Sequence, residues 1–115
     1  MEQPQWICHQ IIFQMQEYGI AVIDDRTGID LNSFLLMRVK GSSTDMIIEI
    51  IFHCRNNMAN VVKNFHLYQN EEFFVLNIPE EMEKHNLTGL IDIMILNMDG
   101  SVEGELEVQL LKEDL

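Results

Sequence analysis

Three glutamates near the C-terminal end are the side chains whose types and spacing most suggest chemistry. Glu103, Glu105 and Glu107 occupy every second position of NMDGSVEGELEVQLL, residues 97–111. Alternate residues of a strand point to the same face, so a strand here would gather three carboxylates on one surface. Such a surface either attracts a cationic partner or is the solvated side of an edge strand, where charges prevent pairing with another chain. We expect this strand to be the last of its sheet.

Two cysteines lie next to histidines, which raises the question of a metal site. Cys8 precedes His9, and His53 precedes Cys54. Adjacent strand residues point to opposite faces, and the sequence has no C-x₂-C or H-x₃-H pair, so zinc binding is not predicted. The segment DDRTGID, residues 24–30, lacks the ligand spacing and the terminal glutamate of an EF-hand loop. We therefore expect no metal and no cofactor.

No motif for nucleophilic catalysis is present in the sequence. The chain has no G-x-S-x-G elbow, and GSSTD, residues 41–45, lacks the lysine of a phosphate-binding P-loop. We therefore expect a protein that is not an enzyme. A small hydrolase is kept as an alternative, because the members of a catalytic triad meet in space rather than in sequence.

The distribution of charge limits the classes of partner. The net charge is −12, and residues 71–115 hold twelve acids against Lys84 and Lys112, a net of −10. Negative charge repels nucleic acid and anionic membranes and favours encounter with basic surfaces. No apolar run approaches the ~20 residues that span a bilayer. We predict a protein partner with a basic surface, no direct binding of nucleic acid and no binding to membranes.

The cysteines and the first residues bear on the compartment. Two cysteines allow at most one disulfide, and both lie in apolar runs, where a free thiol packs as a small hydrophobic group. The first residues carry Glu2 and no positively charged segment, so no signal peptide is predicted. We expect a cytoplasmic protein.

A single domain, residues 1–115, must position these side chains, because this length is enough for one hydrophobic core. Residues 1–18 are expected to form an amphipathic helix, with a proline in the first turn and a glycine after the last. Ile7, Ile11 and Met15 lie on one face at helical spacing, although they would also suit one face of a strand. Residues 19–115 show short apolar runs divided by turn residues, which predicts an antiparallel β region.

The final hairpin is predicted in most detail, since Asp99-Gly100 between apolar arms favours a type I′ turn. This turn would pair Ile93 with Leu106 and place Asp92 across from Glu107. The core face would then carry Val102, Leu106, Val108, Ile91, Ile93 and Ile95. The opposite face would carry an apolar strip rimmed by acid, our candidate partner-binding residues: Glu103, Glu105, Glu107, Asp92, Met94, Leu96 and Met98.

Residues 88–111, TGLIDIMILNMDGSVEGELEVQLL, resemble the last two strands of an Ig-like sandwich. The resemblance covers about a quarter of the chain, carries no specific motif and implies a fold rather than a function. The predicted fold is mainly β: an antiparallel sheet or Ig-like sandwich of about six to seven short strands with the N-terminal helix. The alternative is an α+β domain, with the helix packed on one face of an antiparallel sheet.

Binding is the function that these patterns favour. We predict a non-enzymatic, acidic protein-interaction module that binds a basic partner surface through its acidic C-terminal third. Inhibitors, immunity proteins, anti-defence proteins and chaperones work in this manner. The alternative is a structural subunit of a viral or secretion assembly, a homo-oligomer joined through an edge strand or the N-terminal helix.

Overall fold

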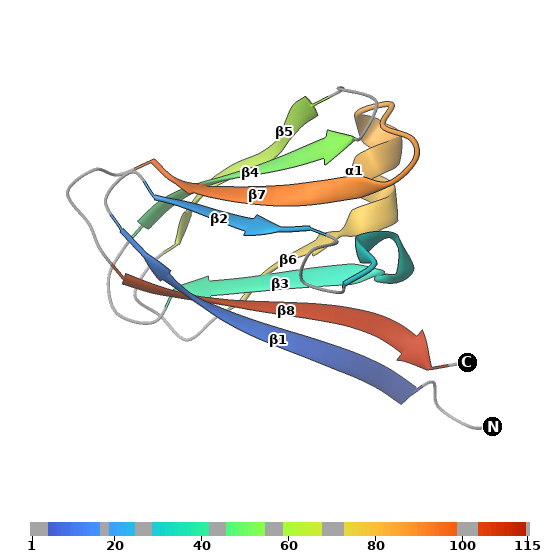
Figure 1. The fold of residues 1–115 in the computed structure, drawn as a ribbon, viewed down its shortest axis with the longest axis horizontal. Coiled ribbons are helices and arrows are strands. Elements are labelled where there is room, and N and C mark those ends of the chain that lie inside the picture. The colour runs from blue at the N-terminus through green and yellow to red at the C-terminus, as the bar shows by residue number, and fades with distance from the viewer. Residues whose placement is uncertain are drawn as a thin grey trace.

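Apolar residues at alternate positions form two four-stranded antiparallel sheets that pack face to face (Figure 1). The computed structural model describes residues 5–16, 19–24, 29–41, 46–54, 59–67, 73–98 and 104–114. Sheet I has the strand order β1 (Gln5–Met15), β8 (Gly104–Asp114), β3 (Leu36–Gly41) and β6 (Phe74–Asn77). Sheet II has the order β2 (Ile20–Ile23), β7 (Ile91–Asn97), β4 (Met46–Cys54) and β5 (Ala59–Leu67).

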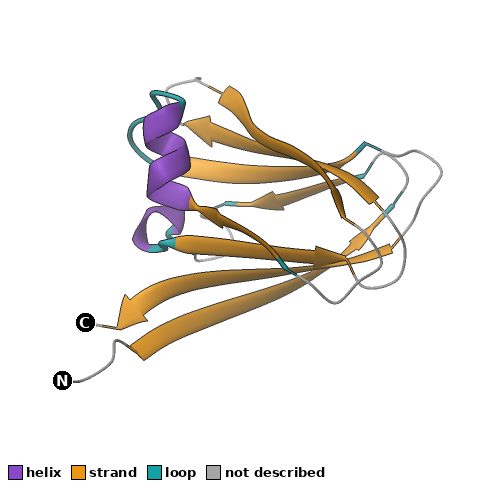
Figure 2. Cartoon of the chain, turned by 180° about the vertical axis from the view of Figure 1, so that it is seen from behind, coloured by secondary structure: helices purple, strands orange, loops and turns teal. Residues whose placement is uncertain are grey.

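Short helical segments lie at one end of the sandwich (Figure 2). The helix α1 (Ile78–Lys84) follows β6 directly, and the 3₁₀ helix η2 (Leu31–Ser33) precedes β3. The sequence favours the start of α1 at this point, because the Asn77 side chain accepts a hydrogen bond from the Glu80 amide at 2.9 Å and a proline follows in the first turn.

The hydrophobic core lies between the inner faces of the two sheets. Alternate residues of β4, β7 and β8 are almost completely buried, as period-two patterns require of strands that cover a core on one side. The fully buried members are Ile23, Met37, Val39, Ile48, Ile50, Phe52, Cys54, Ile93, Ile95, Leu106, Val108 and Leu110.

The N-terminal helix predicted for residues 1–18 is wrong where the structure describes this segment. Residues 5–15 form the long strand β1, which pairs with β8 from Gln5 opposite Asp114 to Met15 opposite Gly104. Tertiary pairing decides between two patterns that the sequence allowed, because a strand here adds a whole ladder of hydrogen bonds to β8.

Gly19, expected to follow a helix, belongs to the connection between β1 and β2. Its amide donates to the Gln16 carbonyl oxygen at 2.9 Å. A Cβ atom at this position would lie 2.8 Å from the same oxygen, so the close approach of the backbone requires glycine.

The predicted pairing of the last two strands is also wrong. β7 pairs with β2 and β4 in sheet II, whereas β8 pairs with β1 and β3 in sheet I. Ile93 and Leu106 are both buried, as predicted, but they belong to opposite sheets. The turn residues Asp99 and Gly100 lie outside the described residues. Alternation identifies the buried face of a strand and cannot distinguish a neighbour in the same sheet from one in the facing sheet.

The strand order corrects the predicted class of sandwich. The mainly β, antiparallel architecture is confirmed, and sheets ordered β1-β8-β3-β6 and β2-β7-β4-β5 are those of an eight-stranded jelly roll. An Ig-like sandwich would keep its last two strands in one sheet. The α+β alternative is wrong too, because α1 is one short helix at an end of the sandwich rather than a layer across a sheet.

Candidate functional site: an exposed apolar sheet face

The predicted partner-binding residues lie on opposite sides of the molecule. Asp92, Met94 and Leu96 alternate with buried residues of β7 and point away from the core on sheet II. Glu105 and Glu107 point away from the core on sheet I, since β8 belongs to that sheet. Glu103 lies outside the described residues. One flat partner surface therefore cannot cover both groups.

Glu105 and Glu107 are engaged by neighbours on their own sheet. Gln14 donates a side-chain hydrogen bond to Glu105 at 3.0 Å, and Gln10 donates one to Glu107. The ammonium group of Lys40 lies 3.7 Å from the Glu107 carboxylate. These contacts arise because β8 lies between β1 and β3, so the prediction that it is the last strand of its sheet is wrong.

The outer face of sheet II carries a contiguous group of apolar side chains. Cross-strand pairs set Ile20 beside Leu96 and Val22 beside Met94, and Met94 is also opposite Ile51 of β4. We call this surface the apolar face and define it by Ile20, Val22, Ile47, Ile51, Met94, Leu96 and Met98.

Four members of the apolar face are well exposed. The exposed fractions are 60% for Ile20, 41% for Val22, 39% for Ile47 and 43% for Met98. Single exposed aliphatic residues are common on proteins, but a contiguous group on one sheet face is typical of a contact surface.

Acidic side chains interrupt and border the apolar face. Glu49 lies opposite Leu96, and its carboxylate has Asn64 Nδ2 at 3.5 Å. Asp92 lies opposite His53 at one end of the face. One oxygen of Asp92, Oδ1, is buried and has no hydrogen-bond partner among the described residues. A buried acceptor without a donor loses hydration without compensation, so the hydrogen bonding of the Asp92 carboxylate is incomplete among the described residues.

Sequence reasoning found the β7 part of this face and missed Ile20, Val22, Ile47 and Ile51. The sequence does contain a sign of this face in residues 20–23, IAVI, and residues 46–52, MIIEIIF. Both segments have apolar residues at odd and at even positions. A strand in a two-layer sandwich buries only one side, so apolar residues on both sides indicate an exposed apolar surface.

The remaining chemistry predicted from the sequence can be placed in the structure. His53 and Cys54 point to opposite faces of β4. Over the described ranges, no three His, Cys, Asp or Glu side chains are grouped to hold a metal ion. Both cysteines are free, with Cys8 exposed on sheet I and Cys54 buried in sheet II. No helix in the described part of the chain is long and apolar enough to cross a membrane.

Comparison with known proteins supports the fold and leaves the function open. No family model matches the chain, and no curated protein matches it. The chain is similar in structure to the mitogen derived from Yersinia pseudotuberculosis, with a TM-score of 0.51 over 98% of this chain and 90% of that one. The two sequences are 13% identical, so the likeness shows a shared β-rich fold alone.

Proposed function

We propose that the protein is a non-enzymatic interaction domain that binds a protein partner through the apolar face of sheet II. The observation that carries this proposal is the exposure of Ile20, Val22, Ile47 and Met98 on neighbouring strands of one sheet. Covering apolar surface is favourable by about 25 cal/mol for each Å² removed from water, so a partner that seats on this face gains affinity from it. The likeness to a mitogen is consistent with an interaction role.

The partner we propose presents an apolar segment together with a basic side chain. Asp92 and Glu49 lie within or beside the apolar face, and the whole chain carries a net charge of −12. An arginine or lysine placed beside the partly exposed Asp92 side chain would complement its negative charge. Glu105 and Glu107, already bound by neighbours on sheet I, are assigned to the folded surface rather than to the interface.

We place this role in the cytoplasm. Cys8 and Cys54 are free and belong to different sheets, and free thiols suit a reducing compartment. The thiols support this placement and do not identify the partner.

Paired lysine substitutions test the interface. Val22→Lys puts a charge on the β2 part of the apolar face, and Ile12→Lys makes the matched change on the outer face of sheet I, where Ile12 is 52% exposed. A partner is first captured from host lysate, identified by mass spectrometry and purified, and its affinity for each variant is then measured by calorimetry. We expect Val22→Lys to weaken binding by about tenfold or more and Ile12→Lys to change it by less than about twofold.

Two further variants separate the acidic groups. Asp92→Asn should weaken binding and reduce its dependence on salt, because it removes the charge that faces the partner's basic side chain. The double variant Glu105→Gln/Glu107→Gln should bind as the unaltered protein does. A partner that tolerates Val22→Lys but is lost with the double variant would place the interface on sheet I and overturn the proposal.

A further inference from the structure

A pocket of about 340 Å³ opens at the end of the sandwich that carries the chain termini. Here β1 and β8 extend beyond sheet II, as Figure 1 shows, so their inner faces are not covered by a facing strand. His9 pairs with buried Leu110, so by register His9 and Ile7, two residues before it, point toward the inner side of sheet I. The side chains of Ile7 and His9 nevertheless remain exposed.

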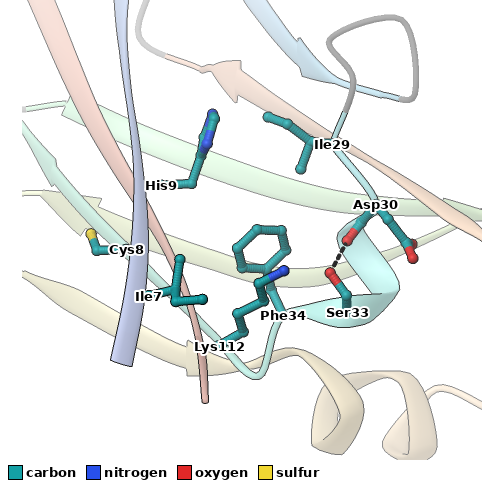
Figure 3. A pocket seen from close by; sticks show the side chains of 8 residues that line it. All are labelled: Ile7, Cys8, His9, Ile29, Asp30, Ser33, Phe34 and Lys112. Atoms are coloured by element: carbon teal, nitrogen blue, oxygen red, sulfur yellow. Dashed lines mark hydrogen bonds between the residues drawn. The ribbon is translucent and has the colours of Figure 1, made fainter. Parts of the chain in front are cut away.

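The segment before β3 forms the opposite wall of the pocket. Ile29 and Phe34 are buried and flank η2, and together with Ile7 they provide apolar walls. Figure 3 shows Ile7, Ile29, Phe34 and the imidazole of His9 around one space. Apolar walls with a few converging polar groups are typical of small-molecule sites, and the volume lies at the lower end of their range.

Lys112 supplies a cation to the lining of the pocket. Its ammonium group lies 5.4 Å from the centre of the Phe34 ring, and it forms no ion pair with any described residue. Contact with the ring face leaves the ammonium N–H groups available to an acceptor. His9 lies diagonally across from Lys112 on the same face of the β1–β8 ladder, where it provides a second donor.

The other polar groups of the pocket do not neutralise Lys112. The carboxylate of Asp30 accepts a hydrogen bond from the Asn32 amide at 3.1 Å, and Figure 3 shows it directed away from Phe34 and Lys112. The Ser33 hydroxyl donates to the Asp30 carbonyl oxygen at 2.7 Å. Cys8, on the outer face of β1, points away from the space between the two walls.

We propose that this pocket binds a small organic carboxylate with a flat apolar body. The carboxylate accepts hydrogen bonds from Lys112 and His9, and the body lies between Ile7, Ile29 and Phe34. The site is formed by inner faces of sheet I and the η2 segment, whereas the apolar face is on the outside of sheet II. The two proposals therefore stand or fall separately.

Benzoate is a suitable probe, because it combines a carboxylate with a flat ring. Titration of the ¹⁵N-labelled protein should shift amides of residues 7–9, 29–34 and 112 saturably. Benzamide has the same ring without the charge, and acetate has the charge without the ring. We expect each of them to bind about tenfold more weakly than benzoate, since each lacks one half of the recognition.

Two lysine variants complete the test. Lys112→Gln should weaken benzoate binding by about tenfold, while Lys40→Gln, on the outer face of sheet I, should leave it within about twofold. His9→Gln should weaken binding with the ring contacts intact. Absence of saturable shifts at these residues up to about 50 mM benzoate would overturn the proposal. Equal binding of benzamide, or full binding by Lys112→Gln, would overturn it as well.

Discussion

Glu81 shows that an acidic residue of the C-terminal third can serve the fold rather than a partner. Its side chain is buried, with a residue exposure of 5%. The ammonium group of Lys63 on β5 lies 3.3 Å from its carboxylate, and His85 and Lys84 lie within 3.6 and 3.9 Å. The Glu81 carboxylate thus links α1 to β5, the edge strand of sheet II. A count of acidic residues along the sequence cannot distinguish one that stabilises the fold from one that contacts a partner.

Replacement of Glu81 tests how much this link between α1 and β5 contributes to stability. We expect Glu81→Ala to lower the free energy of unfolding by about 2 kcal/mol, below the range for fully buried pairs because the Lys63 side chain is 35% exposed. Glu80→Ala is the matched control on the same helix, since Glu80 is 63% exposed and 4.0 Å from Lys84. It should change stability by less than about 0.5 kcal/mol in urea denaturation. Equal losses for the two variants would contradict the role given to Glu81.

At the scale of elements, one side chain joins two segments that are far apart in sequence. Asn32 of η2 donates to the Gly89 carbonyl oxygen at 2.8 Å, and its Oδ1 accepts from the Ile91 amide at 3.1 Å. These bonds hold the wall of the pocket against the start of β7. Gly89 has a φ of 87°, a left-handed conformation that glycine adopts without strain.

Removal of the Asn32 side chain should loosen this junction. We expect Asn32→Ala to lower the free energy of unfolding by about 1–2 kcal/mol, because the amide of buried Ile91 loses its acceptor. The matched control is Asn64→Ala, whose side chain is exposed and lies 3.5 Å from the Glu49 carboxylate. Hydrogen exchange should show faster exchange of the Ile91 amide in Asn32→Ala alone. An unchanged exchange rate would show that the junction does not depend on Asn32.

The elements themselves were partly predictable. The buried alternation of residues 91–95 and 106–110 follows from the sequence, and the structure confirms it. For residues 5–15 the sequence allowed helix and strand, and pairing with β8 selected the strand. Within the candidate site, Asp92, Met94, Leu96 and Met98 were correctly placed on one side. Their predicted union with Glu105 and Glu107 depended on a hairpin that does not form.

At the scale of the whole molecule, the excess of negative charge opposes compactness. Nineteen acidic residues face seven basic ones, and the ion pairs of the described residues join only a few of them. Like charges repel more strongly when the chain is compact, and dissolved salt screens this repulsion beyond about 10 Å at 0.1 M.

Thermal unfolding at different salt concentrations measures this repulsion. We expect the melting temperature to rise by several degrees, or about 1 kcal/mol, between about 0.02 M and 0.5 M sodium chloride. Circular dichroism at one wavelength is sufficient for the measurement. A melting temperature that falls with salt would mean that attractive pairs such as Lys63–Glu81 outweigh the net repulsion.

By itself the sequence determined the mainly β class, the buried side of the last two strands and the acidic character of the chain. These properties are local or additive, since each depends on residue type and a period of two along one strand. Only the tertiary structure decided which strands pair, and so which outward side chains share a surface. A strand's buried face fits a core equally well in either sheet. The jelly-roll order, by separating β7 from β8, therefore divided the predicted acidic patch and exposed the apolar face instead.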